Sequence, residues 1–274
     1  MIKEVELNDL ETHAKNIRRE ILTMSYNAQS AHTGGALSCV EILVALYFKI
    51  LQIDPLKPLD ADRDRLIFSK AHDAKALYAV LAEKGFFAKG LLEGYEKTGG
   101  KLPGHSTRNC VPGVEVSAGS LGHGLSMAAG VAYAGKMDNK SYKTFAVLSD
   151  GECDEGSTWE AALWSGHHKL ENLTAVVDYN KLQGFGLTKD VLDLEPFADK
   201  WTAFGWCVEE VDGHNMEDLV SLFSSTPFKS DKPSIIIAHT IKGKGGIPKY
   251  ENEMSSQYYP PTKEEFEEIM ENLR

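Results

Sequence analysis

Two polar segments, each directly after an apolar run, carry the strongest chemical signal in the sequence. Asp150 follows TFAVLS, and Asn180 follows LTAVVDY 30 residues further along the chain. A carboxylate and a carboxamide just past two strand ends can converge on a hard cation, and Mg²⁺ favours few carboxylates together with phosphate oxygens. Gly151 and Gly156 would let the backbone approach a phosphate and a helix start beside it. The pattern favours a site for a divalent cation and a diphosphate.

Three histidines are further candidates for chemistry. His32, His72 and His105 lie in loops that contain glycine or follow a predicted strand. One such histidine is more often a structural hydrogen-bonding group, whereas three together favour proton transfer, because imidazole has an unperturbed pKa of about 6.5. Either polar segment alone would be ordinary turn chemistry at a strand end, so the combination is what favours a site. His167 and His168 lie in a helical pattern and are expected to be surface or packing residues.

Apolar alternation and helical periodicity take turns along the chain and predict the elements that position these residues. A helix is expected over 8–28, capped by Asn8 or Asp9. A second helix is expected to start after Ser38, which has capping-box spacing with Glu41, and to run to about residue 51. The predicted strands are 65–69, 144–149, 173–179, 206–211 and 234–239, separated by helices at 73–84, 123–136, 157–169 and 215–224. A short terminal helix is expected from Thr262, with Glu265 at capping-box spacing.

Nearly continuous apolar strands separated by helices are typical of βαβ units around a buried parallel sheet. The predicted fold class is therefore α/β, a doubly wound, mainly parallel sheet with helices on both faces. No repeat or linker divides the sequence, so one domain is expected over 1–274, with a C-terminal extension from about 246 to 274. Ligands of open α/β sheets bind beyond the carboxyl ends of the strands, where the glycine-rich loops of this chain should gather.

Composition excludes several classes of function. The formal net charge of −11 argues against a nucleic-acid or anionic-membrane surface as the main partner. No apolar run approaches the roughly 18 residues of a membrane span, and the N-terminal segment is too polar for the apolar core of a signal peptide. The 4 cysteines form no CxxC pair and are expected to be reduced thiols. A cytoplasmic protein is expected.

The polar segments and histidine loops carry a family resemblance. SDGE…DYN resembles the GDG…N signature of thiamine-diphosphate enzymes, with Ser149 in place of the first glycine. SAHTGGALSCVEI at 30–42, DRLIFSKAHDAKALYAVLAEKG at 64–85 and LPGHSTRNCVPGVEVSAGSLGHGLSMAAGVA at 102–132 are similar to the histidine and glycine-rich motifs of transketolases. The resemblance covers roughly residues 10–245, in family order, and identifies the diphosphate-binding part of a transketolase.

The resemblance implies how the cofactor is held. Thiamine diphosphate would bind with Mg²⁺, for which Ca²⁺ or Mn²⁺ can substitute. The implied metal ligands are Asp150, Asn180 and the carbonyl of Leu182. The implied diphosphate contacts are His72 and the backbones of Gly151 and Glu152, and the aminopyrimidine pocket would be lined by Gly119 and Leu121.

The resemblance also implies a reaction and a partner. His32 and His105 would face the sugar, and Glu155 and Glu160 match carboxylates of a dimer interface that link two active sites. The reaction would be the transfer of a two-carbon ketol unit from a ketose to an aldose. This chain ends at Arg274, soon after the first domain of a transketolase. A second subunit with the pyrimidine-binding and C-terminal domains is therefore expected, in an α₂β₂ assembly.

One departure concerns a further active-site histidine that transketolases usually carry after the IKGKG loop at 241–245. Ser256 or Gln257 stands at that place here. Either the diphosphate is satisfied by Lys242, Lys244 or His239, or the enzyme uses a specialised sugar. A third interpretation, a solvated basic loop, is equally open.

Two alternative functions also stay open. One is the α-subunit of a 2-oxo acid decarboxylating complex, which has a similarly split domain. The other is a non-catalytic subunit that binds the cofactor. The histidine motifs favour the transketolase interpretation, and the identity and phosphorylation of the sugars stay open.

Overall fold

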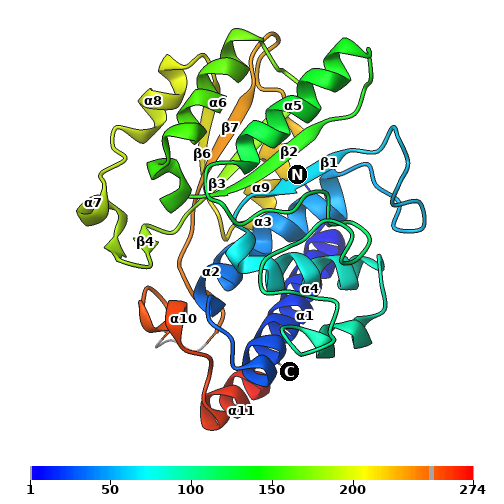
Figure 1. The fold of residues 1–274 in the computed structure, drawn as a ribbon, viewed down its shortest axis with the longest axis vertical. Coiled ribbons are helices and arrows are strands. Elements are labelled where there is room, and N and C mark those ends of the chain that lie inside the picture. The colour runs from blue at the N-terminus through cyan, green and yellow to red at the C-terminus, as the bar shows by residue number, and fades with distance from the viewer. Residues whose placement is uncertain (1, 247–249, 274) are drawn as a thin grey trace.

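The computed structural model describes residues 2–246 and 250–273. Five parallel strands form the central sheet in the order β1-β2-β3-β7-β6 (Figure 1). They are β1 (Arg65–Phe68), β2 (Thr144–Ser149), β3 (Leu173–Tyr179), β6 (Cys207–Asp212) and β7 (Ser234–His239). The predicted strands are confirmed within one residue at each end. The carboxyl ends of β2 and β3 are in register, with Ser149 opposite Asp178, so the segments that follow them lie side by side.

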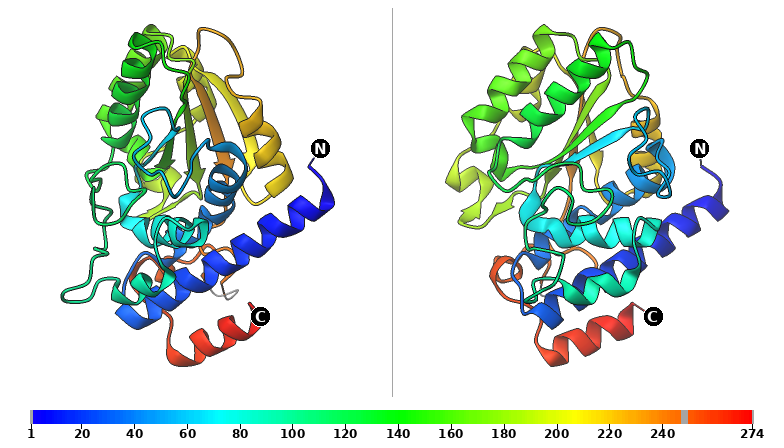
Figure 2. Two further views of the ribbon diagram at one scale, coloured as in Figure 1. Left: turned by 90° about the vertical axis from the view of Figure 1, so that its right-hand side faces the viewer. Right: turned by 45° about the vertical axis from the view of Figure 1, so that its right-hand side comes forward.

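Helices cover both faces of the sheet. On one face lie α1 (Glu4–Ala28), α2 (Thr33–Ser38), α3 (Val40–Ala45), α4 (Ala74–Lys84) and α9 (Met216–Ser224); on the other lie α5 (Gly124–Met137), α6 (Gly156–His167) and α8 (Phe197–Ala203) (Figure 2). Successive residues of β2 supply the two cores: Phe145 and Val147 pack on the α1 side, and Ala146 and Leu148 on the α5 side. The predicted doubly wound α/β class is confirmed.

Two predicted helix starts are wrong. Helix α1 begins at Glu4, after Lys3, so neither Asn8 nor Asp9 caps it. Two glutamates in its first turn favour this earlier start, because negative charge stabilises the N-terminal end of a helix. The expected capping box at Ser38 is absent as well: α3 follows Cys39 without a side-chain cap and continues as a π-helical turn, η1 (Leu46–Ile50). Ser38 donates instead to Asp178, 140 residues away, at 2.5 Å.

The C-terminal part folds back onto the first helix. Helix α11 (Lys263–Asn272) begins with the predicted capping box of Thr262 and Glu265, which is confirmed. It lies along α1 (Figure 2), where the rings of Tyr26 and Phe266 stack at 4.4 Å. Helix α10 (Ser255–Tyr258) contacts α2. The expected extension from about 246 includes 247–249, which lie outside the described residues.

The remaining elements are short and follow no clear sequence pattern. They are η2 (Ala71–Asp73), η3 (Lys89–Gly94), η4 (Gly151–Asp154), β4 (Leu182–Gln183), β5 (Gly186–Leu187) and α7 (Thr188–Val191). Of these, η2, η4 and β4 follow β1, β2 and β3 and so lie at the carboxyl edge of the sheet. Among the helices of the described ranges, none is long and apolar enough to cross a membrane.

Candidate active site

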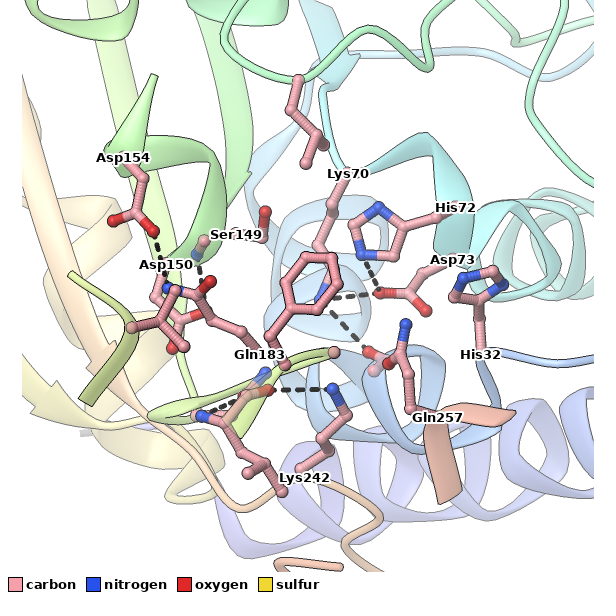
Figure 3. Close-up of a pocket in the computed structure, with 18 of the residues that line it drawn as sticks. His32, Lys70, His72, Asp73, Ser149, Asp150, Asp154, Gln183, Lys242 and Gln257 are labelled. Carbon is pink, nitrogen blue, oxygen red and sulfur yellow. Dashed lines mark hydrogen bonds and ion pairs between the residues drawn. The ribbon is translucent and has the colours of Figure 1, made fainter. Parts of the chain in front are cut away.

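A cavity of about 480 Å³ opens beyond the carboxyl ends of β1, β2 and β3 (Figure 3). Each strand end contributes to its lining. Lys70, His72 and Asp73 follow β1; Ser149 ends β2 and is followed by Asp150 and Gly151; Asn180, Leu182 and Gln183 follow β3. Helix α2 adds Gly35, and His32 stands just before that helix. The cavity is at the edge where an open parallel sheet is expected to bind its ligand.

Asp150 is held by hydrogen bonds and has no ion-pair partner among the described residues. One carboxylate oxygen accepts from the backbone N–H of Gly151 at 2.8 Å, and the other from the N–H of Lys181 at 2.7 Å and the hydroxyl of Thr188 at 3.2 Å. Burial and the nearby Asp178 raise the pKa of Asp150 to about 6. A cation at this carboxylate would relieve that electrostatic cost.

Two neutral oxygens lie beside Asp150. Asn180 is 7% exposed, and its carboxamide oxygen accepts from the N–H of Leu182 at 3.1 Å. The carbonyl of Leu182 accepts from Lys242 Nζ at 2.9 Å. In the described part of the chain, no three His, Cys, Asp or Glu side chains gather as a metal cluster, so one carboxylate and neutral oxygens would have to suffice. Mg²⁺ accepts such a sparse protein ligand set when phosphate oxygens complete it.

Lys242 is the only residue of the KGKG segment described in this cavity lining. It is 4% exposed, and burial lowers its pKa. The interpretation of a wholly solvated basic loop is therefore wrong. The loop is held in place by the N–H of Ile241, which donates to His214 Nε2 at 2.8 Å, and by the N–H of Gly243, which donates to the carbonyl of Gly34 at 2.9 Å.

The three predicted histidines share one end of the cavity. The ring centroid of His32 is 5.5 Å from that of His72 and 6.2 Å from that of His105. His32 has a left-handed backbone, with φ of 64°, and its N–H donates to the carbonyl of Gln257 at 2.7 Å. Burial lowers the pKa of His32 to about 4, so the ring is neutral at pH 7 and offers an unprotonated nitrogen.

Other predicted site residues divide into two groups. Gly119, Leu121 and Glu155 also line the cavity. Glu152, Glu160 and His239 do not. Glu152 is fully buried, and its carboxylate accepts hydrogen bonds from the hydroxyl of Ser69 and the N–H of Ser149. Glu160 is exposed on α6. Nε2 of His239 lies 2.6 Å from Oε2 of Glu210. Of the residues suggested in place of the missing histidine, Lys244 pairs with Glu251 rather than lining the cavity.

The structure also decides between two candidates for the position of that histidine. Ser256 packs against α2, where a Cβ on Gly34 would lie 2.1 Å from its hydroxyl oxygen. Gln257 lines the cavity instead. The sequence reasoning missed Lys70, Asp73, Gln183 and Tyr258, which also line it. For Lys70 and Asp73 the available signal was charge next to an apolar strand. His167 and His168 lie outside, and His168 packs on Trp164 at 4.2 Å, as expected for packing residues.

The family model described as "Transketolase, thiamine diphosphate binding domain" matches residues 11–273. The chain belongs to the transketolase family. It is 42% identical to an apulose-4-phosphate transketolase subunit from Phocaeicola vulgatus, over 98% of this chain and 95% of that protein. It is 44% identical to the 6-deoxy-6-sulfo-D-fructose transketolase subunit SqwG of a Clostridium species, over 86% of each.

Solved transketolases share the fold. The enzyme from Leishmania mexicana superposes with a TM-score of 0.90 at 26% identity, over 96% of this chain and 41% of that one. The enzyme from Campylobacter jejuni gives 0.88 at 28% identity, over 100% of this chain and 43% of that one. This transketolase chain thus spans about two fifths of the solved transketolases and nearly the whole of the Phocaeicola protein.

The burial of His32 predicts a pH dependence. Its ring is expected to titrate near pH 4 instead of 6.5. The unfolded chain takes up this proton near pH 6.5 and the folded chain only near pH 4, so the free energy of unfolding should fall as the pH falls through this window. Histidine NMR titration measures the midpoint, and His32→Gln should flatten that part of the stability profile. A titration midpoint of His32 at pH 6 or above would contradict the lowering of its pKa by burial.

Proposed function

We propose that this chain is the diphosphate-binding subunit of a two-subunit transketolase, which moves a two-carbon ketol unit from a ketose to an aldose. The main support is the similarity of this chain to the Phocaeicola apulose-4-phosphate transketolase subunit over 98% of its length. The cavity adds support, because Asp150, Asn180 and Leu182, the proposed cation ligands, line it together with three histidines. An α-subunit of a 2-oxo acid decarboxylating complex is less well supported, because the family model that matches is that of transketolase.

The cofactor proposed for the cavity is thiamine diphosphate with Mg²⁺. Asp150, Asn180 and the carbonyl of Leu182 would hold the cation, and their fit is supported by the pKa of Asp150, which burial raises to about 6. Lys242 now bonds the Leu182 carbonyl and would have to yield it to the metal. His72 and the N–H of Gly151 are proposed contacts of the diphosphate, and Gly119 and Leu121 are proposed to line the aminopyrimidine pocket. When bound, the cofactor supplies an electron sink for a carbanion.

The protein's own part in ketol transfer would be to bind the sugar and to move protons. The donor must lose a hydroxyl proton and the acceptor oxygen must gain one, which imidazoles can mediate near neutral pH. His32, neutral by burial, would accept a hydrogen bond or proton from a sugar hydroxyl. His105, on the loop that faces it, would bind another hydroxyl. No role for Glu152 or His239 in cofactor binding is proposed, because neither lines the cavity.

The organisation of the whole enzyme is also a proposal. The matched relatives are named as subunits, which supports a second subunit carrying the pyrimidine-binding and C-terminal domains. Glu155 at the cavity rim and Glu160 on α6 are both exposed and would meet partner surfaces in an α₂β₂ complex. The chain is proposed to be one domain over 1–274, whose C-terminal helix α11 packs on α1. Its proposed location is cytoplasmic.

The proposal predicts that the purified chain has no ketol transferase activity by itself. Activity should appear when it is mixed with the second subunit, thiamine diphosphate and Mg²⁺, because this chain supplies only the diphosphate side of the site. The measurement is product formation from a ketose and an aldose, with each of the two chains by itself as a control. Robust turnover by this chain without a partner would refute the split enzyme. A complex that binds cofactor without turnover would favour the non-catalytic alternative.

Asp150→Ala tests the cation site. Metal-dependent cofactor binding by the complex should fall below detection, because the only carboxylate of the proposed ligand set is lost. The fold should persist, since Asp150 lies at a strand end and not in either hydrophobic core. Calorimetry of thiamine diphosphate and Mg²⁺ binding measures the change. Glu268→Ala, at an exposed carboxylate of α11 outside the cavity lining, serves as the matched control. Unchanged cofactor affinity in Asp150→Ala would show that Asp150 is not a ligand of the cation.

Gln257 supports a specialised sugar substrate. A glutamine can donate and accept hydrogen bonds but cannot carry the positive charge of a protonated histidine. A charge-assisted hydrogen bond contributes about 1.5–3 kcal/mol, or roughly tenfold to hundredfold in rate. An enzyme that lacks it would suit a substrate whose charge or hydroxyl pattern does not need it. The relatives are named for apulose 4-phosphate and a sulfofructose, which agrees with this proposal.

Gln257→His is therefore expected to raise kcat/KM for xylulose 5-phosphate with ribose 5-phosphate by about tenfold. The native substrate should gain less. Steady-state kinetics of the reconstituted complex measures both, and Tyr259→His, on the 67% exposed neighbouring tyrosine, is the control. Ser256→His should not substitute for it, because Ser256 packs against Gly34. If the unmodified complex already had the specificity constant of a housekeeping transketolase on these sugars, the idea would be wrong.

A further inference from the structure

Lys75, the second residue of α4, places a fully buried ammonium group close to the His32 end of the cavity. Its exposed fraction is 0%. Nζ donates to the hydroxyls of Ser25 at 3.0 Å and Ser30 at 2.8 Å, and to the carbonyl of Ala31 at 2.6 Å. An ammonium group has three hydrogens, so these bonds use its whole donor capacity. Lys75 does not line the cavity, and the proposed binding of cation and cofactor gives it no role.

The burial of this charge is costly. All three acceptors are uncharged oxygens, whereas a fully buried lysine is usually paired with an opposite charge. Burial lowers the pKa of Lys75 to about 8, although the charges of Asp73 and Glu96 act in the opposite direction. The lysine is therefore charged at pH 7. A buried group whose pKa is perturbed in this way is a candidate for a functional role.

The ammonium group joins the ends of two helices that lie side by side (Figure 2). Lys75 is in the first turn of α4 and bonds Ser25 in the last turn of α1. A positive charge is favourable at the C-terminal end of a helix, and the last turn of α1 has no basic residue of its own. Lys75 therefore supplies this charge to α1 and ties α4 to the turn that leads to His32.

The peptide group between Ala31 and His32 is held at both of its polar atoms. Its carbonyl oxygen accepts from Lys75, and its N–H donates to the carbonyl of Gln257 at 2.7 Å. His32 has a left-handed backbone, with φ of 64°, which is unfavourable for a residue with a side chain. Such a backbone persists only where the surrounding structure fixes it. The two hydrogen bonds do so, one from α4 and the other from α10.

The ammonium group also acts on the imidazole of His32 through space. Burial is the main cause that lowers the pKa of His32 to about 4, and the charge of Asp73 opposes it. The charge of Lys75 adds to the lowering, as do the two neighbouring histidines. Lys75 thus affects both the place of the ring and its protonation.

We propose that Lys75 is a positioning residue, which holds the peptide group between Ala31 and His32 so that the imidazole of His32 stands in the cavity as an acceptor. Its hydrogen bonds fix the backbone, and its charge disfavours a second positive charge on the ring. The positioning requires no cofactor, substrate or partner. That the ring meets a sugar hydroxyl rests on the proposed function.

Two substitutions on α4 distinguish this role from a general contribution to stability. Lys75→Met keeps the length of the side chain and removes the ammonium group. Lys84→Met is the matched control, because Lys84 is a half-buried lysine of the same helix, whose Nζ lies 5.0 Å from the ring centroid of Phe48. It removes a lysine away from the turn at Ala31 and outside the cavity lining.

The first measurement uses the full chain without cofactor or partner. In Lys75→Met the amide proton of His32 should exchange with solvent about tenfold faster, because its peptide group has lost one of two anchors. Nitrogen-15 NMR should also show the titration midpoint of the His32 ring about one pH unit higher, since a nearby positive charge is gone. Both values should stay unchanged in Lys84→Met. Unaltered amide exchange of His32 in Lys75→Met would overturn the proposal.

The second measurement uses the unmodified chain, so it holds even if Lys75→Met does not fold. Nitrogen-15 NMR follows Nζ of Lys75 through its titration, expected near pH 8. The titratable groups that face the ammonium are Asp73, Glu96, Tyr95 and His32. Burial raises the pKa of Tyr95 and lowers that of His32, which separates both from the lysine. The amide shift of His32 should change with the midpoint of Lys75 Nζ, and an amide that does not respond would contradict the positioning role.

The third measurement uses the complex with the second subunit. Lys75→Met should lower kcat for ketol transfer about 100-fold, because a catalytic group displaced by about 1 Å is poorly aligned. Its affinity for thiamine diphosphate and Mg²⁺, measured by calorimetry, should stay unchanged, and Lys84→Met should alter neither value. A cofactor affinity that fell together with kcat would show a general loss of structure and overturn the positioning role. If the unmodified complex had no ketol transferase activity while both NMR results were as expected, the proposed function would be refuted and the positioning of His32 would stand.

Discussion

The buried carboxylate of Asp178 holds the floor of the cavity together. It stands at the end of β3, with 0% exposure, and accepts hydrogen bonds from Ser38 before α3, Lys70 after β1 and Thr240 after β7. Burial alone would lower the pKa of Lys70, but Asp178 raises it well above its usual value, so the two form an ion pair. Breaking such a pair by removing one partner costs about 3–5 kcal/mol. The positions of the groups above it depend on this contact.

Two aspartates near the end of the sheet therefore have opposite electrostatic roles. Asp178 is neutralised by Lys70 and is fully bonded, so it positions other groups and has little capacity left for a ligand. Asp150 receives only backbone N–H groups and a hydroxyl, and burial raises its pKa to about 6. The difference is the location of the cation. At Asp178 the cation is Lys70, whereas at Asp150 the proposed Mg²⁺ would come from outside the chain.

The sheet and the position of the site could be predicted from the sequence because both follow from strong, repeated patterns. Strands buried on both faces are nearly continuous apolar runs, and the five runs match the five strands within one residue. In a parallel sheet all carboxyl ends lie at one edge, so residues that follow the strands, such as Asp150 and Asn180, must come close together. Both hydrophobic cores follow from the same alternation of strand side chains.

The interactions that could not be predicted join residues that are far apart in the sequence. Ser38 and Glu41 have the spacing of a capping box, yet Ser38 bonds Asp178 and Glu41 bonds Arg18 at 2.6 Å. A local cap contributes only about 1 kcal/mol, which is less than a buried, charge-assisted hydrogen bond contributes. The same limit applies to Asp73. The local sequence shows only a charged residue shortly after a strand. The buried position of Asp73 depends on Gly35, because the absence of a side chain there leaves the space for the carboxylate. Charged residues that interrupt an apolar strand end are therefore best explained by asking which distant glycine or opposite charge accommodates them.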